Sequence, residues 1–398
     1  MNASLGPLRS AIGMAATSKS PRKILRVGYL IGKLSLPDYA HKYSPKTYTQ
    51  PQLFACLVLK EFLHRDYRGI EDLLKDTPDL AAVIELDKVP DFTTLQKASK
   101  RLLRSADASR LLDMTVRLGK FLGKLQAPLP RAALDGTGLE SHHASAYYVR
   151  RQAKGGKSEQ KLTYQRFPKA GLVSDCKSHM ILAVVPGRGP GPDIVHFRQA
   201  FDQARRRIRF LSLAADAGYD AEHTHVYGRS RGVRTLIPPL IGRPTDKPPR
   251  GYWRRMMKRV LPRSRYGQRW QSETVNSMLK RLLGSALRAR SYWSQSRETV
   301  LRALTLNIMI LRRRKVFDRA GLTPFPVFSG LFRSPFPVPF RRNPIPPTTP
   351  IQRRGLSLQT SIHLTGNLRC LFCLLVLVTR RECSGLRRKV YYDSPATE

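Results

Sequence analysis

Carboxylates are scarce in this chain, so the positions that keep one are informative. Its 398 residues carry 71 Lys and Arg against 28 Asp and Glu, a formal net charge of +43. Asp135 and Asp216 each follow a short apolar run that reads as a strand, and Glu273 stands alone in a stretch of arginines and lysines. Oxygen ligands of this kind suit Mg²⁺, and a pair of such ions can drive phosphoryl transfer. We expect these three carboxylates to form a metal site, although each alone could be a turn, a helix cap or a salt-bridge partner.

A helix over about residues 269–287 is expected to carry Glu273 on a narrow polar stripe. If the helix starts by Tyr266, then Tyr266, Arg269 and Lys280 all project within about 40° of Glu273. The apolar positions fall on the opposite face and are Val275, Leu279, Leu282 and Ala286. The apolar face would pack on the domain, while Arg269 and Lys280 neutralise phosphates and Tyr266 donates a hydrogen bond or stacks.

The elements that must position these residues form an α/β pattern over about residues 129–315. Short apolar runs predict strands at 132–135, 170–173, 180–185, 210–215 and 235–238. Pro186-Gly187 is expected to close the third of these strands, and helices are expected over 193–204 and 299–311. Strands followed by alternating strands and helices indicate a mixed α/β domain.

Residues 25–128 have a helical pattern throughout. Thr49-Gln50-Pro51 opens one helix, a second ends at Thr77-Pro78, and Asp91 caps a third. The third helix has an outer face of basic residues, which are Lys97, Lys100, Arg101 and Arg104. A small helical domain with such a helix suits DNA binding of the helix-turn-helix kind, although a solvated basic face on a structural module would look the same.

The two ends of the chain lack such patterns. Residues 1–24 read as a loose arm, and the proline-rich residues 316–398 read as a disordered tail or as translation beyond the functional end of an altered frame. The longest apolar stretch, residues 370–378, is about half of what a membrane span needs. A membrane is therefore excluded as the partner, and the positive charge favours nucleic acid.

The spacing Tyr266-x2-Arg269-x3-Glu273-x6-Lys280 resembles the Y-(2)-R-(3)-E-(6)-K signature of bacterial insertion-sequence DDE transposases, of the insertion-sequence-four type. Asp135-Gly136 and Asp216 resemble that family's first and second aspartate motifs, in the same order. The resemblance covers roughly residues 45–312. The large β-rich insertion of some members is absent, and the tail has no counterpart in the family.

This resemblance implies a ribonuclease-H-like core with Asp135, Asp216 and Glu273 as catalytic residues and ligands of two Mg²⁺ ions, for which Mn²⁺ can substitute. It also implies that Tyr266, Arg269 and Lys280 bind DNA near the cleaved end. The protein would cleave at terminal inverted repeats, join the 3′-hydroxyl to target DNA, and act as a homodimer on DNA. Its expected place is the bacterial cytoplasm, at the nucleoid.

Two further acids compete for a role in the site. Asp220 is expected to cap a helix, and Asp193 to start a helix near the site with at most a supporting part. Two further functions also stay open. One is a nuclease of the same fold that cuts without joining, and the other is a non-catalytic or degenerate DNA-binding protein derived from a transposase.

Overall fold

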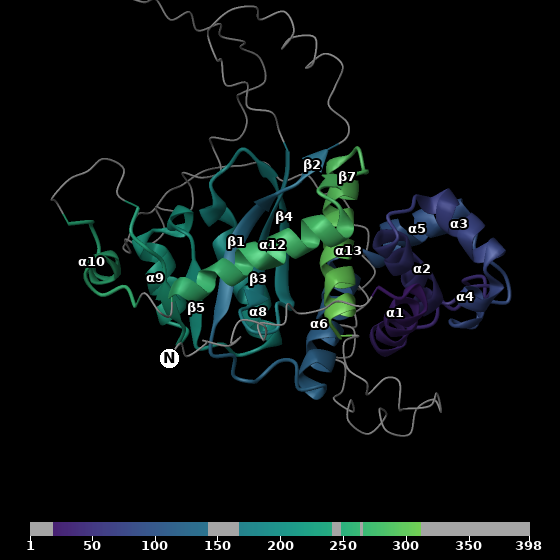
Figure 1. The fold of residues 1–398 in the computed structure, drawn as a ribbon, viewed down its shortest axis with the longest axis horizontal. Coiled ribbons are helices and arrows are strands. Elements are labelled where there is room, and N and C mark those ends of the chain that lie inside the picture. The colour runs from purple at the N-terminus through teal and green to yellow at the C-terminus, as the bar shows by residue number, and fades with distance from the viewer. Residues whose placement is uncertain (1–18, 142–166, 241–247, 263–265, 312–398) are drawn as a thin grey trace, which may run out of the picture. The chain divides into compact units, whose positions relative to one another are not determined.

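The computed structural model describes residues 19–141, 167–240, 248–262 and 266–311 (Figure 1). All of these belong to one compact unit, Met1–Thr323. The expected C-terminal tail, residues 316–398, lies outside the described residues, as does most of the expected N-terminal arm. The arm is shorter than expected because Ser20 caps a helix that begins at Pro21, where proline suits the first turn.

The N-terminal part of the described chain is helical, as expected. Its helices are α1 (Pro21–Ser35), α2 (Gln50–Phe62), α3 (Tyr67–Asp76), α4 (Pro78–Ala82), α5 (Phe92–Leu102) and α6 (Ser105–Phe121). Thr49 and Gln52 form a reciprocal capping box at the start of α2, and the Asp91 carboxylate accepts from the Thr93 N–H at the start of α5. These caps satisfy backbone donors that a helix leaves free, which fixes where each helix begins.

A mixed five-stranded sheet forms the centre of the second part, with strand order β4-β3-β1-β5-β6. Its strands are β1 (Ala132–Gly138), β3 (Phe167–Asp175), β4 (Ile181–Gly189), β5 (Ser212–Ala215) and β6 (Arg234–Leu236). β3 is antiparallel to β1 and β4, whereas β1, β5 and β6 are parallel. A short parallel pair, β2 (Glu140–Ser141) and β7 (Ala286–Leu287), lies beyond β1.

The expectation that Pro186-Gly187 closes β4 was wrong. β4 continues to Gly189 and pairs with β3 through both residues. β4 is an edge strand, where a proline can be accommodated without breaking a central ladder. Gly187 is also needed there, since a Cβ at this position would overlap the His196 ring.

Helices cover both faces of the sheet. The helices of this part are η1 (Asp193–His196), α8 (Phe197–Arg207), η2 (Ala217–Tyr219), α9 (Glu222–Arg229), α10 (Tyr252–Arg259), η3 (Gly267–Arg269), α12 (Trp270–Leu283) and α13 (Tyr292–Leu311), of which α10 packs on α9 and not on the sheet. Asn276 of α12 reaches Asp135, whereas Asp193 of η1 lies against Gly136. Neighbouring strand residues point to opposite faces, so α12 and η1 lie on opposite sides of β1. Figure 1 shows α12 crossing in front of β1.

The helix that carries Glu273 is shorter than expected. α12 ends at Leu283, and Gly284 follows with φ +90°, a left-handed conformation that favours glycine. Ala286, expected on the apolar face, therefore lies in β7. Val275 and Leu279 are buried as expected, at 0% and 1% exposure. The backbone is already helical at Tyr266, but as a 3₁₀ turn that precedes the α-helix.

α13 joins the helical part to the sheet. Asn307 is fully buried, and its amide donates to the Ile181 carbonyl of β4 and to the Thr115 hydroxyl of α6. The Asn307 Oδ1 in turn accepts from the Ile181 N–H at 2.8 Å. No helix among the described residues is long and apolar enough to cross a membrane. The structure thus confirms the expected mixed α/β class.

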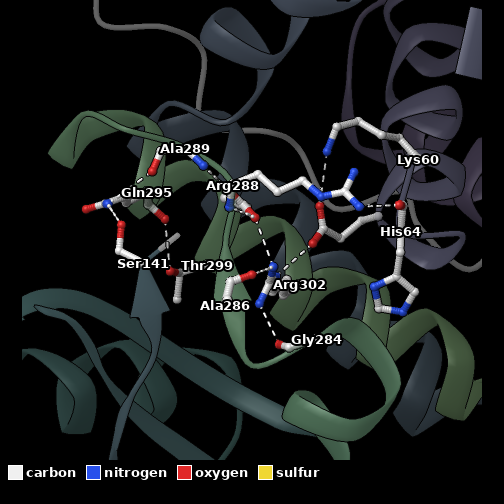
Figure 2. A network of polar contacts seen from close by, with 12 residues as sticks. Lys60, His64, Ser141, Gly284, Ala286, Arg288, Ala289, Gln295, Thr299 and Arg302 are labelled. Carbon is white, nitrogen blue, oxygen red and sulfur yellow. Dashed lines mark hydrogen bonds and ion pairs between the residues drawn. The ribbon is translucent and has the colours of Figure 1, made fainter. Parts of the chain in front are cut away.

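Arg302 of α13 is the centre of a buried polar network (Figure 2). Its guanidinium is 3% exposed, pairs with Glu61 of α2 at 2.8 Å, and pairs with Glu298 at 2.9 Å. It also donates to the carbonyls of Gly284 at 2.6 Å and Ala286 at 2.7 Å, directly after the end of α12. One side chain therefore ties α2, the end of α12 and β7 together.

Candidate functional site

The parallel register brings the two candidate aspartates to one place. Leu134 of β1 pairs with Ala215 of β5, so Asp135 lies opposite the position of Asp216. Neighbouring strands in a sheet lie roughly 5 Å apart, and paired residues of parallel strands point to the same face. Asp216 directly follows β5 with an extended backbone, and its carboxylate is exposed. The two carboxylates therefore lie side by side, Asp135 within β1 and Asp216 directly after the end of β5.

Asp135 is half-buried and held from two directions. Its Oδ1 accepts from the Gly136 N–H at 2.9 Å, and its Oδ2 accepts from the Asn276 amide at 3.0 Å. Burial raises the pKa of Asp135 to about 6, partly offset by the Arg269 cation and the Gly136 N–H, and the Asp216 and Glu273 carboxylates raise it further. The three candidate carboxylates thus lie within electrostatic reach of one another.

Glu273 is exposed and is held by its neighbour one turn earlier. Arg269 Nη2 lies 2.5 Å from Glu273 Oε1, as expected of residues four apart on one helix face. Burial raises the pKa of the Tyr266 hydroxyl; the Arg269 cation lowers it, and the Asp216 and Glu273 carboxylates raise it. Tyr266, Arg269 and Glu273 therefore form one cluster, which also reaches Asp216.

Lys280 lies beside the same site, two turns further along α12. Glu273 and Lys280 line an open hollow at the end of β1, together with Gly136, Thr137, Gly138, Asn276, Ser277 and Arg281. Its floor is backbone and small side chains, and its rim carries the cations of α12. A hollow of this composition can admit a phosphate group close to Glu273.

The donor set suits a hard cation such as Mg²⁺, although the side chains are not gathered around one point. Among the described residues, no three Asp, Glu, His or Cys side chains are close enough to hold one metal ion. Glu273 is engaged by Arg269, and Asp216 accepts from the Ala217 N–H at 2.7 Å. Asn276 Oδ1 is buried beside Asp135, with no hydrogen-bond donor among the described residues. Three carboxylates and an unsatisfied oxygen fit a divalent ion chemically, provided that Arg269 releases Glu273.

Asp193 supports the site from the other face of the sheet, a contact that sequence spacing did not reveal. Its carboxylate lies directly against Gly136 and pairs with Lys169 Nζ at 2.7 Å. Burial raises the pKa of the Tyr219 hydroxyl, and the negative charges of Asp193, Asp135 and Asp216 raise it further. Gly136, which has no side chain, is the one sequence signal that could have indicated a close neighbour directly after Asp135.

Asp220, the rival of Asp216, has a structural role that differs from the expected helix cap. Its side chain is 0% exposed and pairs with Arg254 of α10 at 2.7 Å. It also accepts from the Leu240 N–H at 2.7 Å. The expectation failed because α10, which supplies the partner, was not foreseen between Leu240 and Tyr266. Asp220 holds α10 against α9 and does not face the three carboxylates.

Gly136→Ala is expected to destabilise the protein by about 1–3 kcal/mol, because the new methyl group would overlap Oδ1 of Asp193. Urea denaturation measures this loss. Gly267→Ala is the matched control, since a Cβ at that position meets nothing within 4 Å, and its effect should stay within about 0.5 kcal/mol. Adding Asp193→Ala to Gly136→Ala should cost less than the sum of the single changes, because the truncation makes room. Equal losses for Gly136→Ala and Gly267→Ala would refute the contact.

Comparison with known proteins finds a family model that matches the second part of the chain. Residues 127–308 match the family model of the transposase DDE domain. No curated protein matches the chain. The crystal structure of a pre-cleavage Mos1 transpososome is similar at 11% identity, over 68% of this chain and 81% of that chain, with a TM-score of 0.19. A TM-score this low supports no argument about the fold.

Proposed function

Because residues 127–308 match a transposase DDE domain, we propose that this protein is a DNA transposase that cleaves element ends and joins the freed 3′-hydroxyl to target DNA. The observation that carries the proposal is the pairing of Leu134 with Ala215, which places Asp135 and Asp216 side by side on the face of the sheet that α12 and Glu273 cover. The mixed sheet supports the ribonuclease-H-like core, and the order of the three acids supports the insertion-sequence-four type.

The proposed catalytic residues are Asp135, Asp216 and Glu273, which would bind two Mg²⁺ ions. These ions would supply an activated water and neutralise charge on the leaving oxygen. Asn276 orients the Asp135 carboxylate through its 3.0 Å hydrogen bond. Arg269 can exchange Glu273 for a phosphate oxygen, because its guanidinium keeps its charge at all relevant pH values.

The cations around the hollow beside Glu273 would bind the phosphates of the DNA. Lys280 and Arg281 line the hollow beside Glu273, and Tyr266 reaches Arg269 on the same side. Phosphoryl transfer requires little covalent chemistry from the protein, so positioning and charge neutralisation supply most of the rate enhancement. Tyr266, Arg269 and Lys280 are the residues we assign to this positioning.

We propose that residues 25–128 are the domain that recognises the terminal repeats. α5 carries Lys97 and Lys100 as exposed side chains, with Asp91 fixing its start, and the exposed Arg104 follows its end. Two DNA ends must be brought together for strand transfer, which implies a homodimer on DNA. Both activities would take place on chromosomal DNA in the cytoplasm.

The function is tested with the full chain and a duplex carrying the inverted repeats that flank its coding sequence. We expect cleavage at the repeat boundary with Mg²⁺, none with EDTA, and a joined product when a pre-cut end meets target DNA. Cleavage without a joined product would indicate a nuclease of the same fold instead. Absence of metal-dependent cleavage would contradict the proposal and favour a non-catalytic DNA-binding protein.

A further inference from the structure

A basic groove lies where the N-terminal helices meet the start of α13. Its walls come from α2, α3 and α5 on one side, and from the β7–α13 connection and the first two turns of α13 on the other. The hollow has a volume of about 380 Å³ and shares no lining residue with the hollow beside Glu273. The cationic side chains that line it are Lys60, Lys100, Arg288, Arg290 and Arg297.

The two acidic residues that line this groove, Asp66 and Glu298, already have partners within the protein. The Asp66 carboxylate caps α3 by accepting from the Gly69 N–H at 2.8 Å. Glu298 is paired with Arg302 at 2.9 Å and accepts from the Ala289 N–H at 2.9 Å. Neither carboxylate neutralises the cations that face the open side of the groove.

Lys100 and Arg290 supply the charge that remains for a ligand. Both are exposed, and neither has an acid within ion-pair distance in the described part of the chain. Lys60 differs, because it is buried and lies 3.3 Å from Glu61. The charged groups at the bottom of the groove are thus neutralised by ion pairs within the protein. Two exposed cations remain at its opening, Lys100 of α5 and Arg290 of the segment before α13.

The position of the groove relates it to the candidate site. α12 runs from Glu273 past Lys280 and ends at Leu283, just before β7 and Arg288. Ten helical residues span about 15 Å, which corresponds to roughly four or five base pairs of duplex. A duplex with its end at Glu273 would therefore reach the groove within its first turn, passing the cations at the end of α12.

We propose that this groove binds the phosphodiester backbone of the duplex next to the cleaved end. Lys100 and Arg290 contact phosphates, and the hydroxyls of Ser99, Ser291 and Ser294 line the same hollow as further donors. Such contacts set the register of the DNA without reading its sequence. The assignment rests on the proposed function, since it takes DNA as the ligand.

The experiment measures binding of the full chain to a fluorescein-labelled duplex as a function of salt, without Mg²⁺. Removing two phosphate contacts with Lys100→Ala/Arg290→Ala should reduce the slope of log affinity against log salt by about 1.8. Affinity should fall at least about tenfold at ~0.1 M salt. Arg117→Ala/Arg209→Ala is the charge-matched control: both arginines are exposed, lie outside the groove, and should change the slope by less than about 0.5. Lys100→Arg/Arg290→Lys keeps both positive charges and should therefore keep the parent's slope of log affinity against log salt.

Equal slopes for the groove variant and its control would overturn the assignment to the groove. So would an equal loss of affinity for polyglutamate, since that would indicate a surface for any polyanion. Loss of binding in the Lys100→Arg/Arg290→Lys variant would likewise count against it, because that variant keeps both charges. If the parent and its variants bind with the expected slopes but the parent does not cleave DNA with Mg²⁺, the proposed catalytic function is refuted and the assignment of the groove as a DNA-binding surface is kept. If the parent binds no duplex, both fail.

Discussion

Asp216→Asn is expected to lower Mg²⁺-dependent DNA cleavage by roughly 10³-fold while leaving the free energy of unfolding within about 0.5 kcal/mol of the parent. Asp216 is exposed, and its carboxylate accepts a hydrogen bond from the Ala217 N–H. Asparagine keeps that acceptor and removes the negative charge that a metal ion requires. The loss should therefore appear in cleavage and not in stability.

Asp220→Asn provides the contrast, because Asp220 was the competing aspartate. Its buried carboxylate is bound to Arg254 and the Leu240 N–H, so losing the charge should destabilise the protein by about 1–3 kcal/mol. Cleavage rates at saturating DNA are compared for both variants under conditions where each is folded. Full activity of Asp216→Asn, or inactivity of a stably folded Asp220→Asn, would reverse the assignment of the second aspartate.

Arg302→Met is expected to destabilise the protein by about 3–5 kcal/mol, the largest stability effect we predict. The substitution keeps most of the side-chain volume but removes the cation 2.8 Å from Glu61, whose side chain is 5% exposed, and leaves Lys60 at 3.3 Å as its cationic neighbour. It also removes the donors to the carbonyls of Gly284 and Ala286. Breaking a buried, hydrogen-bonded ion pair costs several kcal/mol, far more than a surface pair contributes.

Urea denaturation of the full chain measures this effect. Arg22→Met, which breaks an exposed pair with Asp79, is the matched control and should change stability by less than about 1 kcal/mol. Adding Glu61→Gln to Arg302→Met should recover part of the loss, because it removes the buried negative charge that has lost its closer cation. If Arg302→Met and Arg22→Met were equally stable, the buried network would not hold the helical part to the core.

Local signals in the sequence were sufficient for the starts of α2 and α5 and for the end of β5 before Asp216, but not for the start of α13, which begins at Tyr292 and not at Thr299. Thr49 and Asp91 cap α2 and α5 because a side-chain oxygen can satisfy free backbone donors regardless of what lies around it. An apolar run followed by an acid marked both Asp135 and Asp216, but only β5 ends at that point. β1 continues through Asp135 to Gly138. The spacing of Arg269 and Glu273 also held, because residues four apart on a helix meet.

Contacts between distant segments were not predictable in this way. Proline within β4 is tolerated because β4 is an edge strand, a property of the whole sheet and not of Pro186. Asp220 looked like a helix cap until Arg254, 34 residues later, was placed beside it. Arg302 pairs with Glu61 across 241 residues, and no local pattern records such a pair.

By itself, the sequence of this protein determined which residues could perform metal-assisted phosphoryl transfer, because residue type and helical spacing are local properties. Only the tertiary structure decided that Leu134 pairs with Ala215, so that the next residues, Asp135 and Asp216, lie side by side. It also decided that Asp193 fills the space above Gly136 and that Lys100 faces Arg290 across a groove. Burial and packing between distant segments set these relations, and they exist only once the chain has folded.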